Sequence, residues 1–184
     1  FNARDLFPAE DLAARPMRFP EVLAGQTVII ERPLLRKDGT TLPVEVNVNL
    51  IGDRLQAIVR DISARHETEL QMRKLSGALE QTTDLAVITD ASGVIEYVNP
   101  AFEKVTGYSF NEVHGKTPRI LKSGRQDKEF YERMWSTALR GEAFHDVFIN
   151  RCKDGSLYYE EETITPFKDA QGRITHFISI GKNI

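Results

Sequence analysis

A tripeptide that occurs twice constrains this chain more than any other feature of its sequence. Lys37-Asp38-Gly39 recurs as Lys153-Asp154-Gly155, and each copy separates a run rich in β-branched and aromatic residues from a run of alternating apolar and polar residues. Asp-Gly between two such runs predicts a β-hairpin, because glycine readily adopts the positive φ of a tight turn. Repetition of the whole pattern indicates two copies of one structural unit. The flanking strands are expected at residues 27–35 and 42–50, and again at 144–151 and 157–165.

A third strand is expected in each copy. A second turn follows the alternating run, at Gly52-Asp53 in the first copy and at residues 169–172 in the second. Residues 55–59 and 174–180 then have the composition of strands, and they lead to Asp61-Ile62-Ser63 and Asn183-Ile184. The sequence therefore predicts two three-stranded antiparallel meanders of the same design.

The second copy has further elements ahead of its meander. Residues 85–89 and 94–98 are typical of strands, and Asn99-Pro100 begins a short helix with a capping residue and a proline at its first position. Asp127 caps a predicted helix over residues 128–140. Its apolar face carries Phe130, Tyr131, Met134, Trp135 and Leu139. The first copy has far fewer residues before its first strand, so we expect its opening strands and helix to be either absent or disordered.

The stretch between the copies is charged and lacks proline, with apolar residues at Met72, Leu75 and Leu79. This spacing predicts an amphipathic helix, which Gly77 weakens. Two interpretations stay open: a helix that pairs with its symmetry mate or packs on a sheet, and a solvated spacer. The predicted organisation is a partial first domain over 1–63, a linker helix over 64–83 and a complete second domain over 84–184.

Composition argues against several classes of protein. The chain has 24 Lys and Arg against 27 Asp and Glu, and no element concentrates basic residues as a nucleic-acid-binding surface would. No apolar run approaches the roughly 18 residues of a membrane helix. The single cysteine, Cys152, cannot form an internal disulfide, and no Cys/His cluster has zinc spacing. We therefore expect a cytoplasmic fragment of a longer protein, without a metal, nucleic-acid or membrane site.

The second copy resembles a PAS domain over its whole length. The motifs that carry the resemblance include Ile88-Thr89-Asp90, Thr106-Gly107-Tyr108, the Arg-Ile-Leu-Lys-Ser-Gly run at 119–124, and Asn150-Arg151 before the second Lys-Asp-Gly. Residues 1–63 resemble the C-terminal part of another PAS domain, ending in an Asp-Ile-Ser variant of the Asp-Ile-Thr signal-relay motif. The resemblance implies an α+β PAS fold, a five-stranded antiparallel sheet of order 2-1-5-4-3 with helices over one face enclosing a pocket. The tandem would have a truncated first copy.

The resemblance also bears on the cofactor. Light-sensing members of the family carry a cysteine where this chain has Pro118, and their three flavin-binding amides correspond here to Asn150, Glu160 and Gly181. Since Cys152 lies elsewhere in the chain, a light-activated flavin–cysteine adduct is not expected. Haem-binding members supply an axial histidine from the helix before the meander. Residues 128–140 contain no histidine, so haem is not expected either.

A redox-sensing branch that carries FAD, like the flavoprotein regulators of nitrogen fixation and methane oxidation, is a closer match. In this resemblance Trp135 would lie against the flavin ring and Asn150 would hydrogen-bond its polar edge, although an acidic pocket residue of that branch falls at Pro118. A core aromatic residue explains Trp135 equally well. FAD therefore stays open as a cofactor. The candidate pocket residues are Phe102, Met134, Trp135, Asn150 and Glu160.

The sequence shows no catalytic constellation. No histidine has motif spacing from a serine or cysteine nucleophile, and no glycine-rich loop is typical of phosphate binding. Adjacent carboxylates in the run Glu160-Glu161-Glu162 face opposite sides of a strand, so we expect mainly a solvated face, with Glu160 or Glu162 toward the pocket or helix side. Residues 1–184 are therefore not expected to form an enzyme.

These observations together predict a sensory segment. It would detect a small-molecule or redox signal, or mediate homodimerisation through the linker helix and the PAS faces. It would then pass the change to an output domain outside the fragment. The resemblance implies that this domain is a diguanylate cyclase or phosphodiesterase, or a histidine kinase. The alternatives are a ligand-free dimerisation and relay module, with its pocket filled by its own side chains, and an FAD redox sensor. The candidate relay residues are Asp61, Ile62, Asn183 and Ile184.

Overall fold

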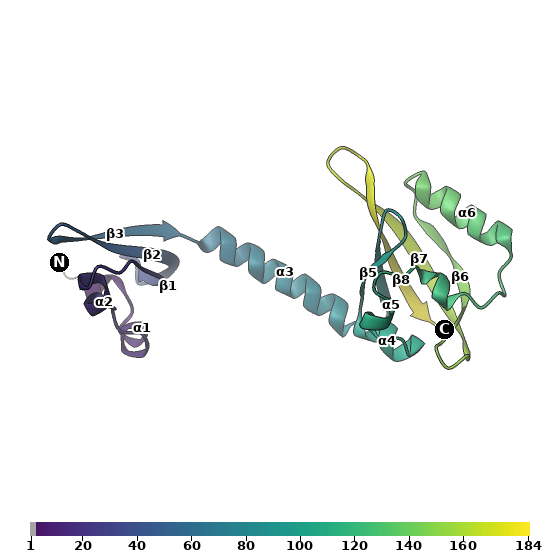
Figure 1. Ribbon diagram of the computed structural model, residues 1–184, viewed down its shortest axis with the longest axis horizontal. Coiled ribbons are helices and arrows are strands. Elements are labelled where there is room, and N and C mark those ends of the chain that lie inside the picture. Colours follow the sequence, from purple (N-terminus) through teal and green to yellow (C-terminus); the bar gives the residue numbers. More distant parts are fainter. Residues whose placement is uncertain (1–2) are drawn as a thin grey trace. The chain divides into compact units, whose positions relative to one another are not determined.

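The computed structural model describes residues 3–184, and the chain falls into two compact units, Phe1–Lys74 and Leu75–Ile184. Residues 1 and 2, with which the first domain was expected to begin, lie outside the described residues. The first unit has an antiparallel sheet of order β1-β2-β3 (Figure 1). Its elements are η1 (Ala3–Leu6), α1 (Ala9–Ala14), α2 (Phe19–Leu23), β1 (Val28–Leu35), β2 (Thr41–Ile51) and β3 (Arg54–Asp61). The predicted meander of the first copy is confirmed.

The second unit contains a five-stranded antiparallel sheet of order β5-β4-β8-β7-β6. Counted along this unit, the order is 2-1-5-4-3, so the predicted PAS topology is confirmed. Helix α3 (Ser63–Gln81) lies between the two sheets in sequence. The other elements are β4 (Leu85–Asp90), β5 (Ile95–Val98), α4 (Pro100–Thr106), α5 (Phe110–Val113), η2 (Pro118–Leu121), α6 (Lys128–Leu139), β6 (Phe144–Arg151), β7 (Leu157–Lys168) and β8 (Ile174–Asn183).

Both Lys-Asp-Gly segments form the predicted hairpin turns. In each turn the aspartate Oδ1 accepts the backbone N–H two residues later, at 2.9 Å for Asp38 and Thr40 and at 2.9 Å for Asp154 and Ser156. The turn glycine has a φ of 83° in the first copy and 92° in the second, which only glycine adopts without strain.

The two meanders share one register, so each position of the first has a counterpart in the second. Val44 of β2 and Glu160 of β7 stand at the same distance after their respective Lys-Asp-Gly turns. Each pairs on both sides with equivalent residues of the neighbouring strands. The matched rows are Arg32, Val44 and Asp61 in the first meander and Phe148, Glu160 and Asn183 in the second.

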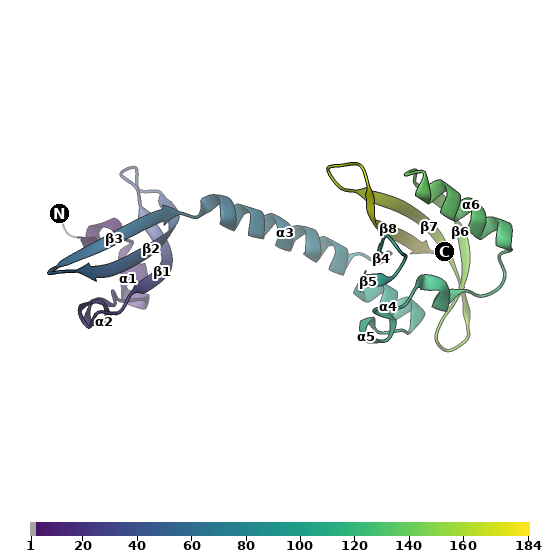
Figure 2. The same ribbon diagram turned by 45° about the horizontal axis from the view of Figure 1, so that its top comes forward.

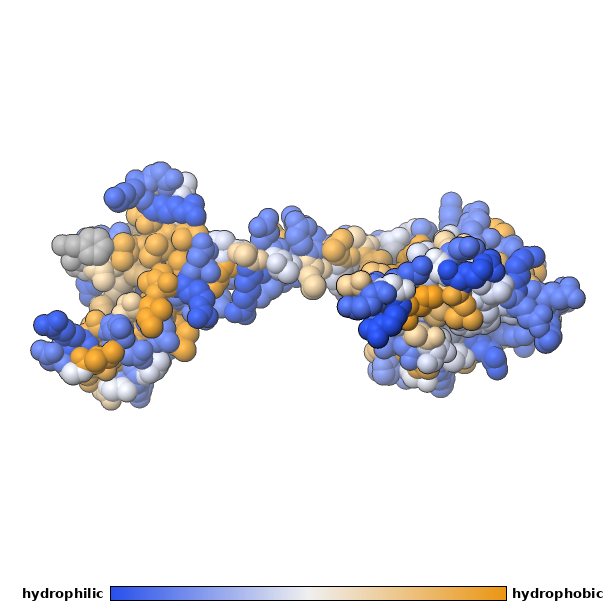
Figure 3. All heavy atoms as spheres, turned by 90° about the horizontal axis from the view of Figure 1, so that it is seen from above, coloured by the Kyte–Doolittle hydropathy of each residue, from blue (hydrophilic) through white to orange (hydrophobic). Residues whose placement is uncertain are grey.

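The outer edge of β3 differs from that of β8. Strand β4 pairs along β8, whereas no strand among residues 3–184 pairs with the outer edge of β3. Every residue of β3 is consequently exposed, including Leu55 at 44% and Val59 at 46%. Figure 3 shows apolar residues gathered on the face of the first unit that this view presents.

A buried ion pair stabilises the helical side of the first unit. The Arg32 guanidinium donates from Nε to Asp11 Oδ2 at 3.0 Å and lies 4.6 Å from the centre of the Phe7 ring. Both charged side chains are almost fully buried. The sequence did not predict this pair, because Asp11 and Arg32 lie on separate elements with no shared periodic pattern.

Asn99 fixes the start of α4 against β4. Its Oδ1 accepts the N–H groups of Ala86 at 2.9 Å and Phe102 at 3.0 Å. Its Nδ2 donates to the carbonyls of Leu79 at 3.0 Å, in the last turns of α3, and of Asp84 at 2.9 Å. The side chain is fully buried, so the predicted helix cap also ties α4 to β4, to α3 and to the connection between those two elements.

Helix α6 covers part of the sheet beside β6 and β7 (Figures 1 and 2). Asp127 caps it as predicted, by accepting the N–H of Phe130 at 2.8 Å. At the outer end of the predicted apolar face, Leu139 is 61% exposed and Trp135 is 40% exposed. Both line a cavity, so this part of the face does not pack wholly on the sheet.

Candidate functional site

A cavity of about 860 Å³ lies in the second unit, lined by residues of α6, η2 and the strands of the sheet. Small-molecule sites in proteins usually have volumes of about 300 to 1,000 Å³. The structure brings all five candidate pocket residues to its wall. These are Phe102 on α4, Met134 and Trp135 on α6, Asn150 on β6 and Glu160 on β7. Their side chains line this space without filling it.

Aromatic side chains form one side of the cavity. The Trp135 indole meets Phe177 edge to face, with ring centres 5.6 Å apart at an interplanar angle of 84°. Gly93 lies against the indole, since a Cβ at this position would come within 3.2 Å of Trp135 Cη2. Tyr131 lines the same space and carries the Lys122 ammonium 4.2 Å from its ring centre. This wall suits a flat apolar ligand.

Asn150 and Glu160 form a polar pair on the part of the cavity wall that the sheet supplies. Asn150 and Glu160 are 7% and 4% exposed, and Asn150 Nδ2 donates to Glu160 Oε2 at 3.3 Å. The Glu160 carboxyl lies over Gly181, where any Cβ would collide with it. In light-sensing members of the family, amide residues stand at the positions of Glu160 and Gly181. Here Gly181 leaves the space that the Glu160 carboxyl occupies.

The prediction of a mainly solvated Glu160-Glu161-Glu162 face requires correction. Only Glu161 is exposed, whereas Glu160 and Glu162 both line the cavity. The alternation along β7 places residues two apart on the same side, so the outer two carboxyls of the run share one face. Ser179 Oγ donates a hydrogen bond to the Glu162 carboxyl.

Burial controls the ionisation of these two acids. Burial, followed by the negative charge of Glu162, raises the pKa of Glu160 to about 8. Burial raises the pKa of Glu162 to about 7, against the opposing effect of the hydrogen bond from Ser179. Two acids that titrate next to each other share their protons. The pair therefore carries less than its full negative charge near neutral pH.

No thiol faces the cavity. Pro118 lines it at the position where light-sensing members carry cysteine. The single cysteine, Cys152, packs against the hydrophobic core of the second unit, and its Sγ donates to the Val105 carbonyl at 3.3 Å. No group of three or more metal-ligating side chains lies together within residues 3–184. No helix in this range combines the length and apolar character needed to cross a bilayer.

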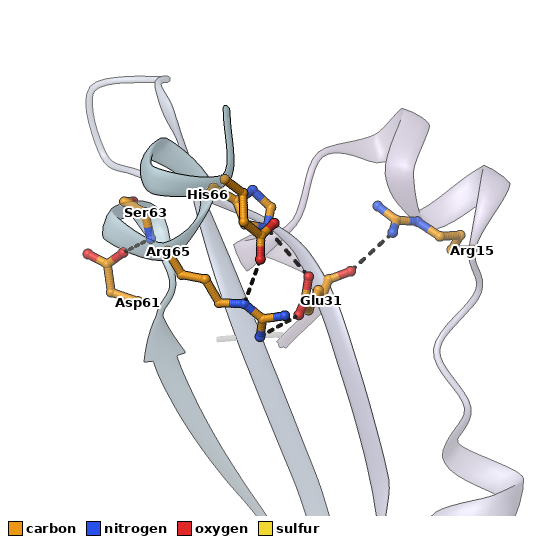
Figure 4. Close-up of polar contacts among 7 residues, drawn as sticks. Arg15, Glu31, Asp61, Ser63, Arg65 and His66 are labelled. Carbon is orange, nitrogen blue, oxygen red and sulfur yellow. Dashed lines mark hydrogen bonds and ion pairs between the residues drawn. The ribbon is translucent and has the colours of Figure 1, made fainter. Parts of the chain in front are cut away.

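The candidate relay residues of the first unit stabilise the start of α3. Asp61 Oδ1 accepts the N–H of Ser63 at 2.8 Å (Figure 4). Ile62 is 5% exposed, and its N–H donates to the Pro43 carbonyl of β2 at 3.1 Å. The last residue of β3 and the first of α3 are thus joined directly.

Glu31 is a further residue at this junction, and sequence reasoning missed it. Its carboxylate lies 3.5 Å from the Arg65 guanidinium and 3.4 Å from His66 Nε2, both in the first turn of α3 (Figure 4). Its backbone carbonyl accepts a hydrogen bond from Arg15 at 3.1 Å. Nothing in the sequence around Glu31 marks it, because the contacts arise only when the first turn of α3 comes close to β1 in the folded unit.

The relay candidates of the second unit lie at the end of β8. Asn183 pairs in register with Glu160, directly beside the polar side of the cavity. Ile184 is 61% exposed, and its N–H donates to the Tyr159 carbonyl at 3.0 Å. A change at Glu160 therefore has a short path to the end of the described chain.

Curated relatives are signalling proteins. A nitrogen fixation regulatory protein of Klebsiella pneumoniae is 36% identical over 106 residues, which are 58% of this chain and 21% of the relative. The aerotaxis receptor of Escherichia coli is 28% identical over 102 residues, 55% of this chain and 20% of the receptor. A blue-light-activated histidine kinase of Brucella canis is 36% identical over 86 residues, 46% of this chain and 17% of the kinase. The chain spans about a fifth of the length of these relatives.

Solved structures share the fold. An RNA-binding light-oxygen-voltage receptor aligns with a TM-score of 0.56 at 15% identity, over 97% of this chain and 82% of the receptor chain. A light-oxygen-voltage domain studied with a flavin analogue aligns with a TM-score of 0.55 at 28% identity, over 60% of this chain and 84% of its own.

Two family models match the chain. The model described as PAS fold covers residues 73–184, more than half of the sequence, and the model described as PAS domain covers residues 2–64. Together with the five-stranded sheet of order β5-β4-β8-β7-β6, these matches give the family. The chain belongs to the PAS family, as a tandem of two PAS segments.

Proposed function

We propose that this chain is the sensory segment of a signalling protein and that its second unit binds a small molecule in the cavity beneath α6. The observation that carries the proposal is the cavity itself, about 860 Å³ of space lined by aromatic residues and by the polar pair Asn150 and Glu160. The nitrogen fixation regulator, the aerotaxis receptor and the histidine kinase support a role in signal sensing.

The proposed output is conformational. A ligand that changes the position of Glu160 would shift Asn183 and Ile184 at the end of β8, and the change would pass to a C-terminal output domain outside residues 1–184. A diguanylate cyclase or phosphodiesterase, or a histidine kinase, is the proposed output. Catalysis then belongs to that domain and not to this segment, which would act in the cytoplasm.

Homodimerisation is part of the proposal. None of the residues of α3 is buried, and Leu70, Met72 and Leu75 are 51%, 69% and 67% exposed. Apolar residues at these positions suit a contact with a second copy of the helix. Light scattering on the purified chain tests this directly, and a monomer at all concentrations would contradict it.

FAD redox sensing is the second candidate function. Trp135 and Asn150, the two residues for which the resemblance implies flavin contacts, both line the cavity. The volume and the aromatic wall fit an isoalloxazine ring. Asn150 would hydrogen-bond its polar edge, with Glu160 beside it, and the flavin would supply redox chemistry when bound. The nitrogen fixation regulatory protein of Klebsiella pneumoniae, at 36% identity, is named like the regulators of the branch for which the resemblance implies FAD.

The absorption spectrum of the purified protein tests both functions. A flavin would give visible bands that pass into the supernatant after denaturation, and native mass spectrometry would reveal a colourless ligand as added mass. Asn150→Ala should reduce the bound fraction, whereas Asn49→Ala in the first unit should not. A protein without added mass, whose Trp135 fluorescence responds to no small molecule, would favour the ligand-free dimerisation module instead.

A further inference from the structure

We propose that Glu160 and Glu162 form a subsite for a positively charged nitrogen group, so that the ligand of the cavity is an amine or amidine on a flat apolar body. The proposal rests on the sensory function proposed for the cavity and names the chemical class of its ligand. It starts from an internal comparison that the repeated meander provides.

The first meander shows what the fold requires at the positions of the two acids. The counterparts of Glu160 and Glu162 are Val44 and Val46, which are 1% and 4% exposed and belong to the core of the first unit. The neighbouring pair differs in the same way: Leu34 and Leu42 stand where the second meander has Asn150 and Tyr158. A meander of this design thus folds with four apolar residues at positions where the second unit has four polar ones.

Placing acids at these positions costs stability. Moving a carboxylate from water into an apolar interior is unfavourable unless a cation or several hydrogen bonds compensate it, and apolar residues at such sites are often as stable or more so. Since the first meander folds with valines at these positions, the packing of the meander does not explain why the second has acids there. A ligand that needs them does.

The protein itself supplies no cation to either acid. None of the ion pairs formed within residues 3–184 includes Glu160 or Glu162. Each carboxyl accepts a hydrogen bond from a neutral donor, Asn150 Nδ2 for Glu160 and Ser179 Oγ for Glu162. Both residues line the cavity, and both carboxyls have acceptor capacity left beyond these bonds.

The other charged groups on the cavity wall lie outside β7, and none of them pairs with Glu160 or Glu162. Lys128 pairs with Glu132 at 2.6 Å on α6, and the Lys122 ammonium lies over the Tyr131 ring. The titratable and charged residues that line the cavity besides the two acids are Arg119 and Lys122 on the η2 side and Lys128, Tyr131 and Glu132 on α6. Tyr158, two residues before Glu160 on β7, is buried in the hydrophobic core.

The aromatic wall favours the same class of ligand. Trp135 and Phe177 line the cavity together with the acids, and the face of an aromatic ring attracts a cation within about 6 Å. A group with several N–H donors can bond both carboxyls at once, while its apolar body packs on the rings. A neutral carbonyl or an anion gains neither contact.

The test uses three probes of nearly the same shape on the full 184-residue chain: benzamidine, which is cationic, benzamide, which is neutral, and benzoate, which is anionic. Binding is followed by ligand-detected NMR and by the fluorescence of Trp135. We expect benzamidine to bind about tenfold or more tightly than benzamide at about pH 8, and benzoate not to bind. Benzamidine affinity should also rise between about pH 6 and about pH 8, because the acids ionise while the amidinium stays charged.

The variants copy the first meander. Glu160→Val and Glu162→Val should each weaken benzamidine binding about tenfold and leave benzamide binding unchanged. If a valine variant does not fold, Glu162→Gln replaces it in the same measurement. Glu161→Gln, on the exposed face of the same strand, is the matched control and should bind like the wild type.

Equal affinities for benzamidine and benzamide, or benzamidine binding that survives both valine substitutions, would overturn the proposal. If riboflavin binds and benzamidine does not, the cationic subsite is wrong while the sensory function stands. If benzamidine, benzamide and riboflavin all fail to bind and the purified chain carries no added mass, the sensory function fails as well.

Discussion

Replacing Glu160 by glutamine should remove most of the pH dependence of the stability of the second unit. Glutamine keeps the shape of the side chain and its contact with Asn150, but it cannot ionise. In the wild type, the unfolded chain releases the Glu160 proton above its ordinary pKa of 4.5, whereas the folded chain keeps it up to about pH 8. The folded state therefore binds more protons between these values, and the free energy of unfolding falls as the pH rises through this window.

The size of the effect follows from the two pKa values. The distance from 4.5 to about 8, at about 1.4 kcal/mol per pKa unit, corresponds to a loss on the order of 5 kcal/mol between about pH 4.5 and about pH 8. The side chain is only 4% exposed, so solvent screening reduces this figure little. Glu162, whose pKa burial raises to about 7, adds a smaller loss in the same direction.

Urea denaturation at about pH 5 and about pH 8 measures the effect. Trp135 is the only tryptophan of the chain and lies in the second unit, so its fluorescence reports the unfolding of that unit. The urea concentration at the wild-type midpoint should be clearly lower at about pH 8 than at about pH 5. Multiplying this difference by the urea slope, about 1–3 kcal/mol per molar, gives the change in the free energy of unfolding. The Glu160→Gln midpoint should change much less.

Glu161→Gln is the control, because Glu161 lies on the exposed face of the same strand. Its pH profile should follow the wild type. The reasoning is refuted if Glu160→Gln keeps the full wild-type slope, or if Glu161→Gln flattens the profile to the same extent.

Three further substitutions test the contacts around the site and the helix junction. Asn99→Ala removes four buried hydrogen bonds and should lower the unfolding free energy of the second unit by about 2–4 kcal/mol in urea denaturation; a loss below about 1 kcal/mol would contradict this role. Gly181→Ala forces a Cβ against the Glu160 carboxyl and should cost about 1–3 kcal/mol in the same assay, with a changed Asn150 side-chain amide signal in NMR; an unchanged signal would show that the carboxyl had not moved. Asp61→Ala removes the acceptor for the Ser63 N–H and should speed amide hydrogen exchange in the first turn of α3 several-fold, whereas Asp53→Ala in the β2–β3 turn should leave that exchange unchanged.

The sequence determined the features that depend on neighbouring residues. The two hairpins follow from Asp-Gly between alternating runs, since only glycine accepts the turn φ without strain. The start of α6 follows from Asp127, whose side chain bonds an N–H three residues away. The strand order of the second unit followed from recognising many separate motifs in one order, and not from any single residue.

Tertiary structure alone decided the character of the site. Whether the pocket is filled or open depends on how far α6 stands from the sheet, and the apolar pattern of a helix is the same in both cases. The sequence allowed Glu160 or Glu162 to face the pocket, and only the fold places both there, with Gly181 leaving room for one of them. The contacts of Glu31 with the start of α3 likewise exist only because the fold brings β1 and the first turn of α3 together in space. Periodic patterns record which face of an element is buried, but the chemistry of a site comes from side chains on several elements, and their distances are fixed only by packing.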